Sequence, residues 1–162
     1  MLVVFAGPLG AVVENVRAAT LAELTRVGLA GFTIDGVARA AGVNRTTIYR
    51  RWPTREALLA SAVEPLLERY DADPATGSLS GDLLALMLTI RDAAQTPEGR
   101  ALAEAVIAGS NELRDLVGAV LDRVLAPFKR ALDQAEARGD RHRPADADAL
   151  VHLIFSGVVL WE

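Results

Sequence analysis

The 162-residue chain contains no cysteine, which excludes a disulfide framework, a thiolate nucleophile and a zinc site built on sulfur. Aromatic residues make up only 5% of the chain, and only two histidines, His142 and His152, are present. The sequence also lacks a glycine-rich phosphate loop and any pairing of histidine with carboxylates at metal-ligand spacing. We therefore expect no enzymatic activity, no metal and no cofactor.

Long apolar runs are missing as well. The longest fall far below the roughly 18 to 20 residues that cross a bilayer, and the apolar residues 1–5 have no basic flank of the kind that marks an export signal. With 51% hydrophobic and 23% charged residues, the chain can still bury a core. These features predict a globular, cytoplasmic protein without membrane contact, one domain long or divided into a small and a larger module.

Strand signals are scarce because alternation of β-branched residues never lasts beyond a few positions, while Ala and Leu dominate every long segment. The sequence therefore predicts an all-α fold. In the first part we expect helices over 12–27, ended by Gly28, over 34–41 with Thr33 as N-cap and Gly42 as stop, over 45–51 with Asn44 as cap, and from a Thr54 cap to residue 67. After a polar loop between Tyr70 and Asp82, further helices are expected near 82–95, 97–109 with Thr96 as cap, 112–138 and 145–161.

The net charge of -4 is unevenly divided. Residues 1–61 hold seven arginines against four acidic residues, 7 - 4 = +3, whereas the remainder holds ten basic and seventeen acidic residues, 10 - 17 = -7. This asymmetry predicts that the first module alone meets a polyanion.

The spacing of three residues fits a helix-turn-helix. Ala38 is small where two helices would approach, Gly42 stands four residues later at the turn, and Ile48 lies six residues further to anchor the third helix in the core. Around a buried side made by Val43, Ile48 and Trp52, the third helix would expose a polar surface suited to a major groove.

The run Thr33-Ile34-Asp35-Gly36-Val37-Ala38, followed by residues 41–58 (AGVNRTTIYRRWPTREAL), resembles the DNA-binding module of the tetracycline-repressor (TetR) family. The resemblance covers about residues 12–60. It implies an N-terminal three-helix helix-turn-helix DNA-binding domain, 1–60, joined to a C-terminal helical ligand-binding and dimerisation domain, 61–162. It further implies a homodimer that binds a palindromic double-stranded DNA operator, usually as a repressor, and is released by a small effector. Unlike many members of the family, residues 1–10 hold no cation that could serve as a basic arm.

The resemblance also implies roles for individual residues. Thr33 and Tyr49 occupy the family's phosphate-contacting hydroxyl positions, and Arg55 stands where a lysine commonly begins the fourth helix, so that its charge and the helix N-terminus could act on one phosphate. Phosphate contacts add affinity without sequence choice, so the operator would be read by few outward side chains. The predicted DNA-binding residues are Thr33, Asn44, Arg45, Thr46, Thr47, Tyr49, Arg50, Arg51 and Arg55, of which Arg45, Thr46 and Thr47 would read base edges and Arg50 and Arg51 would touch phosphates.

The second module carries a broad apolar stripe along residues 113–135, and residues 150–161 are apolar nearly all round. We predict that helices 112–138 and 145–161 supply an isologous two-fold interface, with burial wholly within one subunit as the alternative. The Leu-, Ala- and Val-rich composition suits an apolar effector, with His152 as a weak candidate for a ligand contact. Pro65 and Pro127 interrupt their helices and serve either as hinges or only to shape the packing.

A second functional class stays open at this point: a helical binding or scaffold protein whose motif no longer contacts DNA. Salt dependence distinguishes the two classes, because a protein that neutralises several phosphates loses affinity steeply as salt rises, with a logarithmic slope of about -0.9 per contact.

Overall fold

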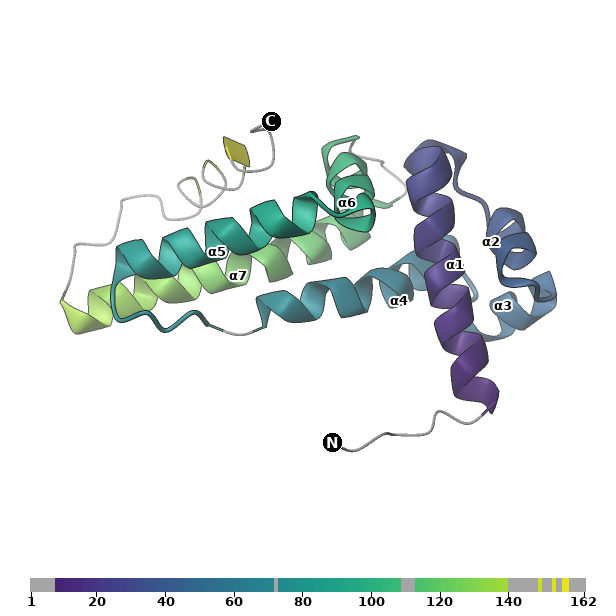
Figure 1. Cartoon of the computed structure of the whole chain (residues 1–162), viewed down its shortest axis with the longest axis horizontal. Helices are drawn as coiled ribbons and strands as arrows, with labels where there is room; N and C mark the ends of the chain where they lie inside the picture. The colour runs from purple at the N-terminus through teal and green to yellow at the C-terminus, as the bar shows by residue number, and fades with distance from the viewer. Residues whose placement is uncertain are drawn as a thin grey trace. The chain divides into compact units, whose positions relative to one another are not determined.

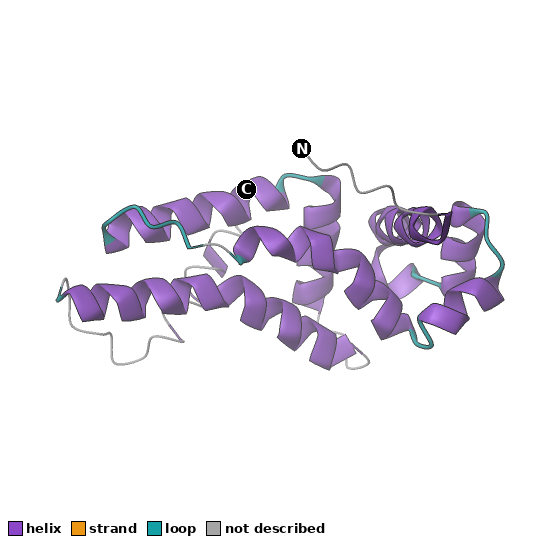
Figure 2. Cartoon of the chain, turned by 90° about the horizontal axis from the view of Figure 1, so that it is seen from below, coloured by secondary structure: helices purple, strands orange, loops and turns teal. Residues whose placement is uncertain are grey.

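The computed structural model describes residues 8–71, 73–108 and 113–139, together with 149, 153, 156 and 157. Within these residues every regular element is a helix and no strand occurs (Figure 2), which confirms the all-α prediction. His142 and His152 lie outside the described residues, and of the predicted helix 145–161 only residues 149, 153, 156 and 157 are described. In the described part of the chain, no helix is both long and apolar enough to cross a membrane.

Two compact units divide the chain, Met1–Glu64 and Pro65–Glu162. The first contains α1 (Pro8–Gly31), α2 (Ile34–Ala41), α3 (Arg45–Arg51) and most of α4 (Arg55–Leu67) (Figure 1). The bounds of α2 and α3 match the predicted 34–41 and 45–51. In contrast, α1 extends beyond the predicted 12–27 on both sides: the backbone leaves the helical conformation at Gly28, with φ 64° and ψ 178°, and then resumes for one short turn.

The core of the first unit is held by apolar side chains that all four helices contribute. Thr20 is buried among them, and its hydroxyl donates to the Val16 carbonyl at 2.7 Å, so the polar group is satisfied inside its own helix. Glu23 is also buried, with its carboxylate bound by Arg26 at 2.8 Å. The buried apolar residues of the unit include Val16, Leu24, Phe32, Val37, Ile48, Trp52, Leu58, Leu59, Ala62 and Val63.

The second unit consists of the end of α4, the 3-10 turn η1 (Glu68–Tyr70), α5 (Leu79–Ala94), α6 (Pro97–Ala108) and α7 (Arg114–Arg138). Figures 1 and 2 both show α5 running alongside α7. The helix α5 begins three residues before the predicted start at 82, because the Ser78 hydroxyl accepts from the Gly81 N–H at 3.2 Å and so caps it. The predicted cap at Thr96 is confirmed by its bond from the Gly99 N–H at 3.1 Å.

The apolar stripe predicted along 113–135 is largely buried, with Val124, Leu125 and Phe128 at its centre. Polar contacts tie the predicted loop after Tyr70 to α7: Arg123 pairs with Asp71 and Arg130 with Asp73, each at 2.7 Å. The residues in each pair are more than fifty positions apart in the sequence, so these contacts stabilise the loop only in the folded unit.

Asp82 anchors the other end of the same loop. Its carboxylate is 2% exposed and accepts from both the backbone N–H and the hydroxyl of Thr76 at 2.8 Å. These two bonds favour the ionised form, so they hold the pKa of Asp82 below its usual value, with Arg138 as a weaker contributor.

Candidate nucleic-acid interface

The turn between α2 and α3 is made by Gly42, which adopts the left-handed conformation, φ 65° and ψ 29°. Glycine favours this conformation because a Cβ atom would crowd the backbone there. The Gly42 N–H donates to the Arg39 carbonyl at 3.3 Å, and the Val43 N–H donates to the Ala38 carbonyl at 3.0 Å. The turn predicted at this glycine is therefore present, and it satisfies the last carbonyls of α2.

The inner side of α3 is fixed by two apolar anchors. Ile48 has no exposed surface and Trp52 is 7% exposed, and the Trp52 N–H donates to the Ile48 carbonyl at 2.8 Å. Val43, predicted to complete this side, is half-buried. With its inner side buried, this two-turn helix can present its remaining side chains only on the other side.

The first turn of α3 is capped by Asn44, whose side-chain oxygen accepts from the Thr46 N–H at 3.0 Å and from the Thr46 hydroxyl at 2.8 Å. Both residues are exposed. The Asn44 oxygen is thus occupied by capping, whereas the hydroxyl oxygen of the exposed Thr46 can still accept a hydrogen bond, as a contact with a base edge would require.

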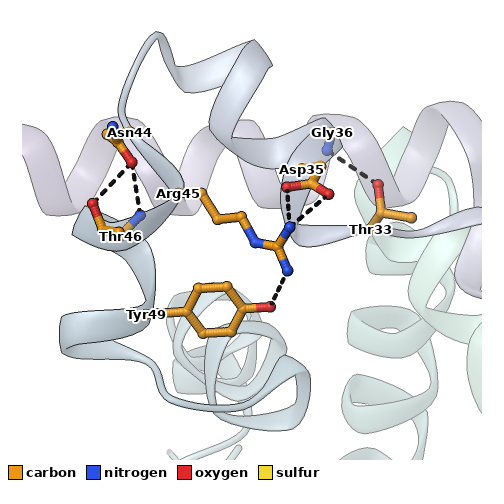
Figure 3. A network of polar contacts seen from close by, with 7 residues as sticks. All are labelled: Thr33, Asp35, Gly36, Asn44, Arg45, Thr46 and Tyr49. Atoms are coloured by element: carbon orange, nitrogen blue, oxygen red, sulfur yellow. Dashed lines mark hydrogen bonds and ion pairs between the residues drawn. The ribbon is translucent and has the colours of Figure 1, made fainter.

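Arg45 is the most constrained of the outward side chains (Figure 3). Its Nη1 lies 3.1 Å from a carboxylate oxygen of Asp35 in α2, its Nη2 donates to the Tyr49 hydroxyl at 3.2 Å, and the guanidinium lies 5.2 Å from the centre of the Tyr49 ring. The bond to Tyr49 and the charge of Asp35 both favour the cation and raise the pKa of Arg45 further above its already high value. Arg45 therefore stays charged at any pH at which the protein folds.

Thr33 and Arg55 flank this surface. The Thr33 hydroxyl caps α2 by accepting from the Gly36 N–H at 3.1 Å, which leaves its own proton for another acceptor. Arg55, half-buried at the start of α4, donates to the Leu29 carbonyl and lies 5.6 Å over the Phe32 ring. Arg55 thus has contacts at the end of α1, and its role on a phosphate stays a prediction.

The remaining predicted residues lie further along α3. Arg50 and Arg51 are exposed, while Thr47 and Tyr49 are half-buried rather than fully outward. The Arg51 guanidinium lies 5.7 Å from the Trp52 ring. A cavity of about 220 Å³, which the sequence did not indicate, is lined by Val12, Val13 and Val16 of α1 and by Thr47, Arg50, Arg51 and Trp52.

Asp35 is the residue of this surface that sequence reasoning missed. An acidic residue in the first turn of a helix is common, because it interacts favourably with the positive helix N-terminus, so Asp35 carries no distinctive signal in the sequence. Its pairing with Arg45 depends on the turn at Gly42 bringing α2 and α3 together. Of the nine predicted DNA-binding residues, Thr33, Asn44, Arg45, Thr46, Arg50 and Arg51 are exposed, whereas Thr47, Tyr49 and Arg55 are half-buried. Their roles on DNA stay predictions.

Comparison with known families gives two matches. A family described as bacterial regulatory proteins, tetR family, matches residues 16–62, and a family described as tetracyclin repressor-like, C-terminal domain, matches residues 73–161. The HTH-type transcriptional regulator AqdR of Rhodococcus erythropolis is 34% identical over 151 residues, which cover 90% of this chain and 71% of that relative. The DNA-binding transcriptional repressor TetR of Mycobacteroides abscessus is 32% identical over 139 residues, 83% of this chain and 73% of its own.

Solved structures share the fold at lower identity. The transcriptional regulator FadR from Bacillus subtilis, in complex with stearoyl-CoA, superposes with a TM-score of 0.73 at 18% identity, covering 90% of this chain and 82% of its own. A tetR-family transcriptional regulator from Streptomyces coelicolor gives a TM-score of 0.69 at 21% identity over 93% of this chain and 70% of its own.

Proposed function

The chain belongs to the tetR family of bacterial regulatory proteins, which are DNA-binding transcriptional regulators, and from this membership we propose that it is a repressor released from its operator by a small apolar effector. The observation that carries the proposal is α3: a capped helix anchored by Ile48, set off by the left-handed turn at Gly42, with cationic and hydroxyl side chains outward. The similarity to the DNA-binding transcriptional repressor TetR of Mycobacteroides abscessus supports this direction of regulation.

We assign the reading of base edges to Arg45, Thr46 and Thr47. An arginine fork matches the O6 and N7 acceptors of guanine, and each such bidentate contact discriminates by about 1–3 kcal/mol against the wrong base. Arg50 and Arg51, exposed at the end of α3, would contact phosphates. Thr33 and Tyr49 would each donate a hydroxyl proton to a phosphate oxygen, since both oxygens already accept a bond within the protein.

The proposed DNA-binding domain corresponds to residues 1–60 and the proposed effector and dimerisation domain to 61–162. A homodimer would place two copies of α3 about 34 Å apart, in successive major grooves of a palindromic operator. The distribution of net charge supports this division of roles, because residues 1–61 carry a net charge of +3 and the remainder a net charge of -7. A polyanion would therefore attract the first part and repel the second.

The second unit contains a cavity that could receive the effector. Its volume is about 60 Å³, and α5, α6, α7 and the end of α4 line it, with apolar side chains such as Leu67, Ile90, Leu102 and Val124. Drug-sized ligands occupy pockets of about 300–1,000 Å³, so an effector of that size must push the lining helices apart. The stearoyl-CoA bound by the Bacillus neighbour carries a long apolar acyl chain, which supports an effector with an apolar part for this fold.

We propose that α4 transmits this displacement. Its last residues, Leu66 and Leu67, line the cavity, whereas its first residue, Arg55, belongs to the first unit. Pro65 stands between them inside the helix and removes one backbone donor, so it is a point where the helix can bend. Replacing Pro65 by Ala should reduce the change in operator affinity that inducer causes. If inducer lowers the operator affinity of this variant as much as that of the parent, Pro65 has no part in the transmission.

The experiment that tests the function is selection of bound sequences from random DNA duplexes. Recovery of one palindrome would support DNA reading and two-fold symmetry together. The rival function, a helical scaffold that no longer contacts DNA, predicts no enrichment and an affinity for duplexes that is flat with salt. Binding through several phosphates predicts instead a steep fall of log affinity with log salt, at about -0.9 per contact.

A further inference from the structure

The network around Arg45 contains a residue that no DNA-binding role yet covers. Asp35 stands in the first turn of α2, where the helix N-terminus stabilises its negative charge, and it holds Arg45 across the turn at 3.1 Å. Tyr49 holds the same guanidinium from the other side at 3.2 Å (Figure 3). Arg45, the side chain proposed to read a base, is therefore bound by one residue of α2 and by one residue of α3.

The ion pair between Asp35 and Arg45 contributes little to the stability of the fold. The side chains of Arg45 and Asp35 are 55% and 58% exposed, and exposed ion pairs of this kind are weak because water and salt screen them. Nothing in the packing of α2 against α3 requires the pair, since Ile48 and the turn at Gly42 already hold the two helices. The consequence of the contact lies in the conformation of Arg45.

A free arginine on a helix surface samples many rotamers, and ordering it on DNA costs conformational entropy. Nη1 lies 3.1 Å from both carboxylate oxygens of Asp35, and Nη2 donates one N–H to Tyr49. Of the five N–H donors of the guanidinium, the Nε–H and the second N–H of Nη2 therefore stay available for two acceptors of a guanine. An arginine that is already ordered before binding does not pay this entropy cost on DNA. More of the free energy of its base contacts is then available to discriminate between bases.

We propose that Asp35 is a positioning residue for base specificity: it fixes the fork of Arg45 against the guanine edge, and its negative charge at the same time weakens contact with DNA of any other sequence. The carboxylate faces the same polyanion that Arg45 meets, so without a correctly placed guanine its repulsion from the phosphates is uncompensated. The inference rests on the proposed function, because it presupposes that Arg45 reads the operator.

The decisive variant is Asp35→Asn, which keeps the shape and removes the charge. Random-duplex selection with the full chain should show the preference at the Arg45-dependent base pair falling about 2- to 10-fold, the size expected when one long side chain must be ordered on binding. Affinity for unselected duplex should rise at the same time, because the protein gains one unit of positive charge. A structural role alone would lower both affinities together.

Glu14→Gln is the matched control. Glu14 also forms an exposed pair with an arginine, Arg17, at 3.0 Å within the first unit, so the variant makes the same charge change away from Arg45. It should raise affinity for unselected duplex without altering any base preference. If both variants shift base preference alike, the effect is one of net charge and the proposal is overturned.

A double-mutant comparison tests whether Asp35 acts through Arg45. Arg45→Ala identifies the base pair that Arg45 reads, and adding Asp35→Asn to Arg45→Ala should change the preference there no further. A further loss in the double variant would overturn the assignment. Unchanged preference in Asp35→Asn alone would do the same.

Two further measurements keep the outcome clear. Thermal unfolding should show that the stability of each variant lies within about 0.5 kcal/mol of that of the parent, as for other exposed substitutions.

If Asp35→Asn does not fold, Asp35→Glu replaces it. This variant keeps the negative charge, so we expect wild-type affinity for unselected duplex and a smaller loss of base preference. Full wild-type base preference would count against a role for the exact placement of the carboxylate. Failure of the parent chain to enrich any sequence refutes the proposed function itself, whereas enrichment by the parent with no effect of Asp35 refutes this inference alone.

Discussion

Replacing Gly36 by Ala sets two known effects against each other inside α2. An alanine in a helix interior is normally favoured over glycine by about 0.5–1 kcal/mol, because glycine loses more backbone freedom on folding. At Gly36, however, an added Cβ would lie 2.0 Å from the Glu23 Oε1 atom and 2.7 Å from its Cδ atom. Contacts this short cannot persist, so either Glu23 or α2 must move.

The surroundings of Glu23 make that movement costly. The carboxylate is buried, at 6% exposed, and Arg26 donates to it at 2.8–3.0 Å through its Nε and Nη2 atoms. Overpacking a site of this kind costs about 1–3 kcal/mol. Subtracting the helix-propensity gain leaves a net loss of about 0–2.5 kcal/mol for Gly36→Ala, with a central value of about 1 kcal/mol. For a unit of this size, each kcal/mol corresponds to a shift in the unfolding midpoint of about 4–8 °C.

Thermal unfolding followed by circular dichroism measures this loss, with Gly118→Ala as control. Gly118 lies inside α7, and a Cβ there meets no heavy atom within 4 Å, so that variant should gain the usual helix-propensity energy. In a Glu23→Ala background most of the penalty at Gly36 should disappear, since the two closest atoms are gone and only the Thr33 hydroxyl oxygen, at 3.1 Å, still lies close to the added methyl group. A Gly36→Ala variant that gains as much stability as Gly118→Ala does, or a penalty that survives in full in the Glu23→Ala background, would refute the reasoning.

Three further predictions concern the turn, the phosphate contacts and the loop of the second unit. Gly42→Ala should destabilise the first unit by about 1–2 kcal/mol, because a side chain in the left-handed conformation is strained even where space is open, and guanidinium unfolding would measure it. Arg50→Gln and Arg51→Gln should each reduce the slope of log affinity against log salt by about 0.9, and an unchanged slope would remove that residue from the phosphate contacts. The pKa of Asp82 is lowered in the folded state by its bonds from Thr76, so its contribution to stability is complete above the unfolded value of about 3.9 and is lost as pH falls through the lower folded value. Asp82→Asn should therefore destabilise the second unit at neutral pH and flatten the acid side of its stability profile, and a profile that matches the parent would contradict this assignment.

The positions of α2 and α3 could be predicted from the sequence because their signals are local. Thr33 and Asn44 cap their helices by bonds to backbone groups two or three residues away, and Gly42 ends α2 through its own backbone conformation. Such contacts need no information from the rest of the chain. The same holds for the Thr96 cap of α6. The start of α5 was misplaced because Ser78 lies in a polar stretch that is typical of a loop, and its capping role emerges only with the helix that follows.

The features that join distant residues could not be predicted from the sequence. The contact between Glu23 and Gly36, the pair of Asp35 with Arg45 and the bonds of Arg123 and Arg130 to the loop before α5 all depend on how helices dock. The family pattern placed Arg45 on the outer side of α3, but only the folded unit shows which carboxylate holds it there. Local sequence was enough to locate α2, α3 and the start of α6, because neighbouring atoms settle each of these caps. The orientation and charge environment of the outward side chains of α3 come from packing between helices, which no local pattern encodes.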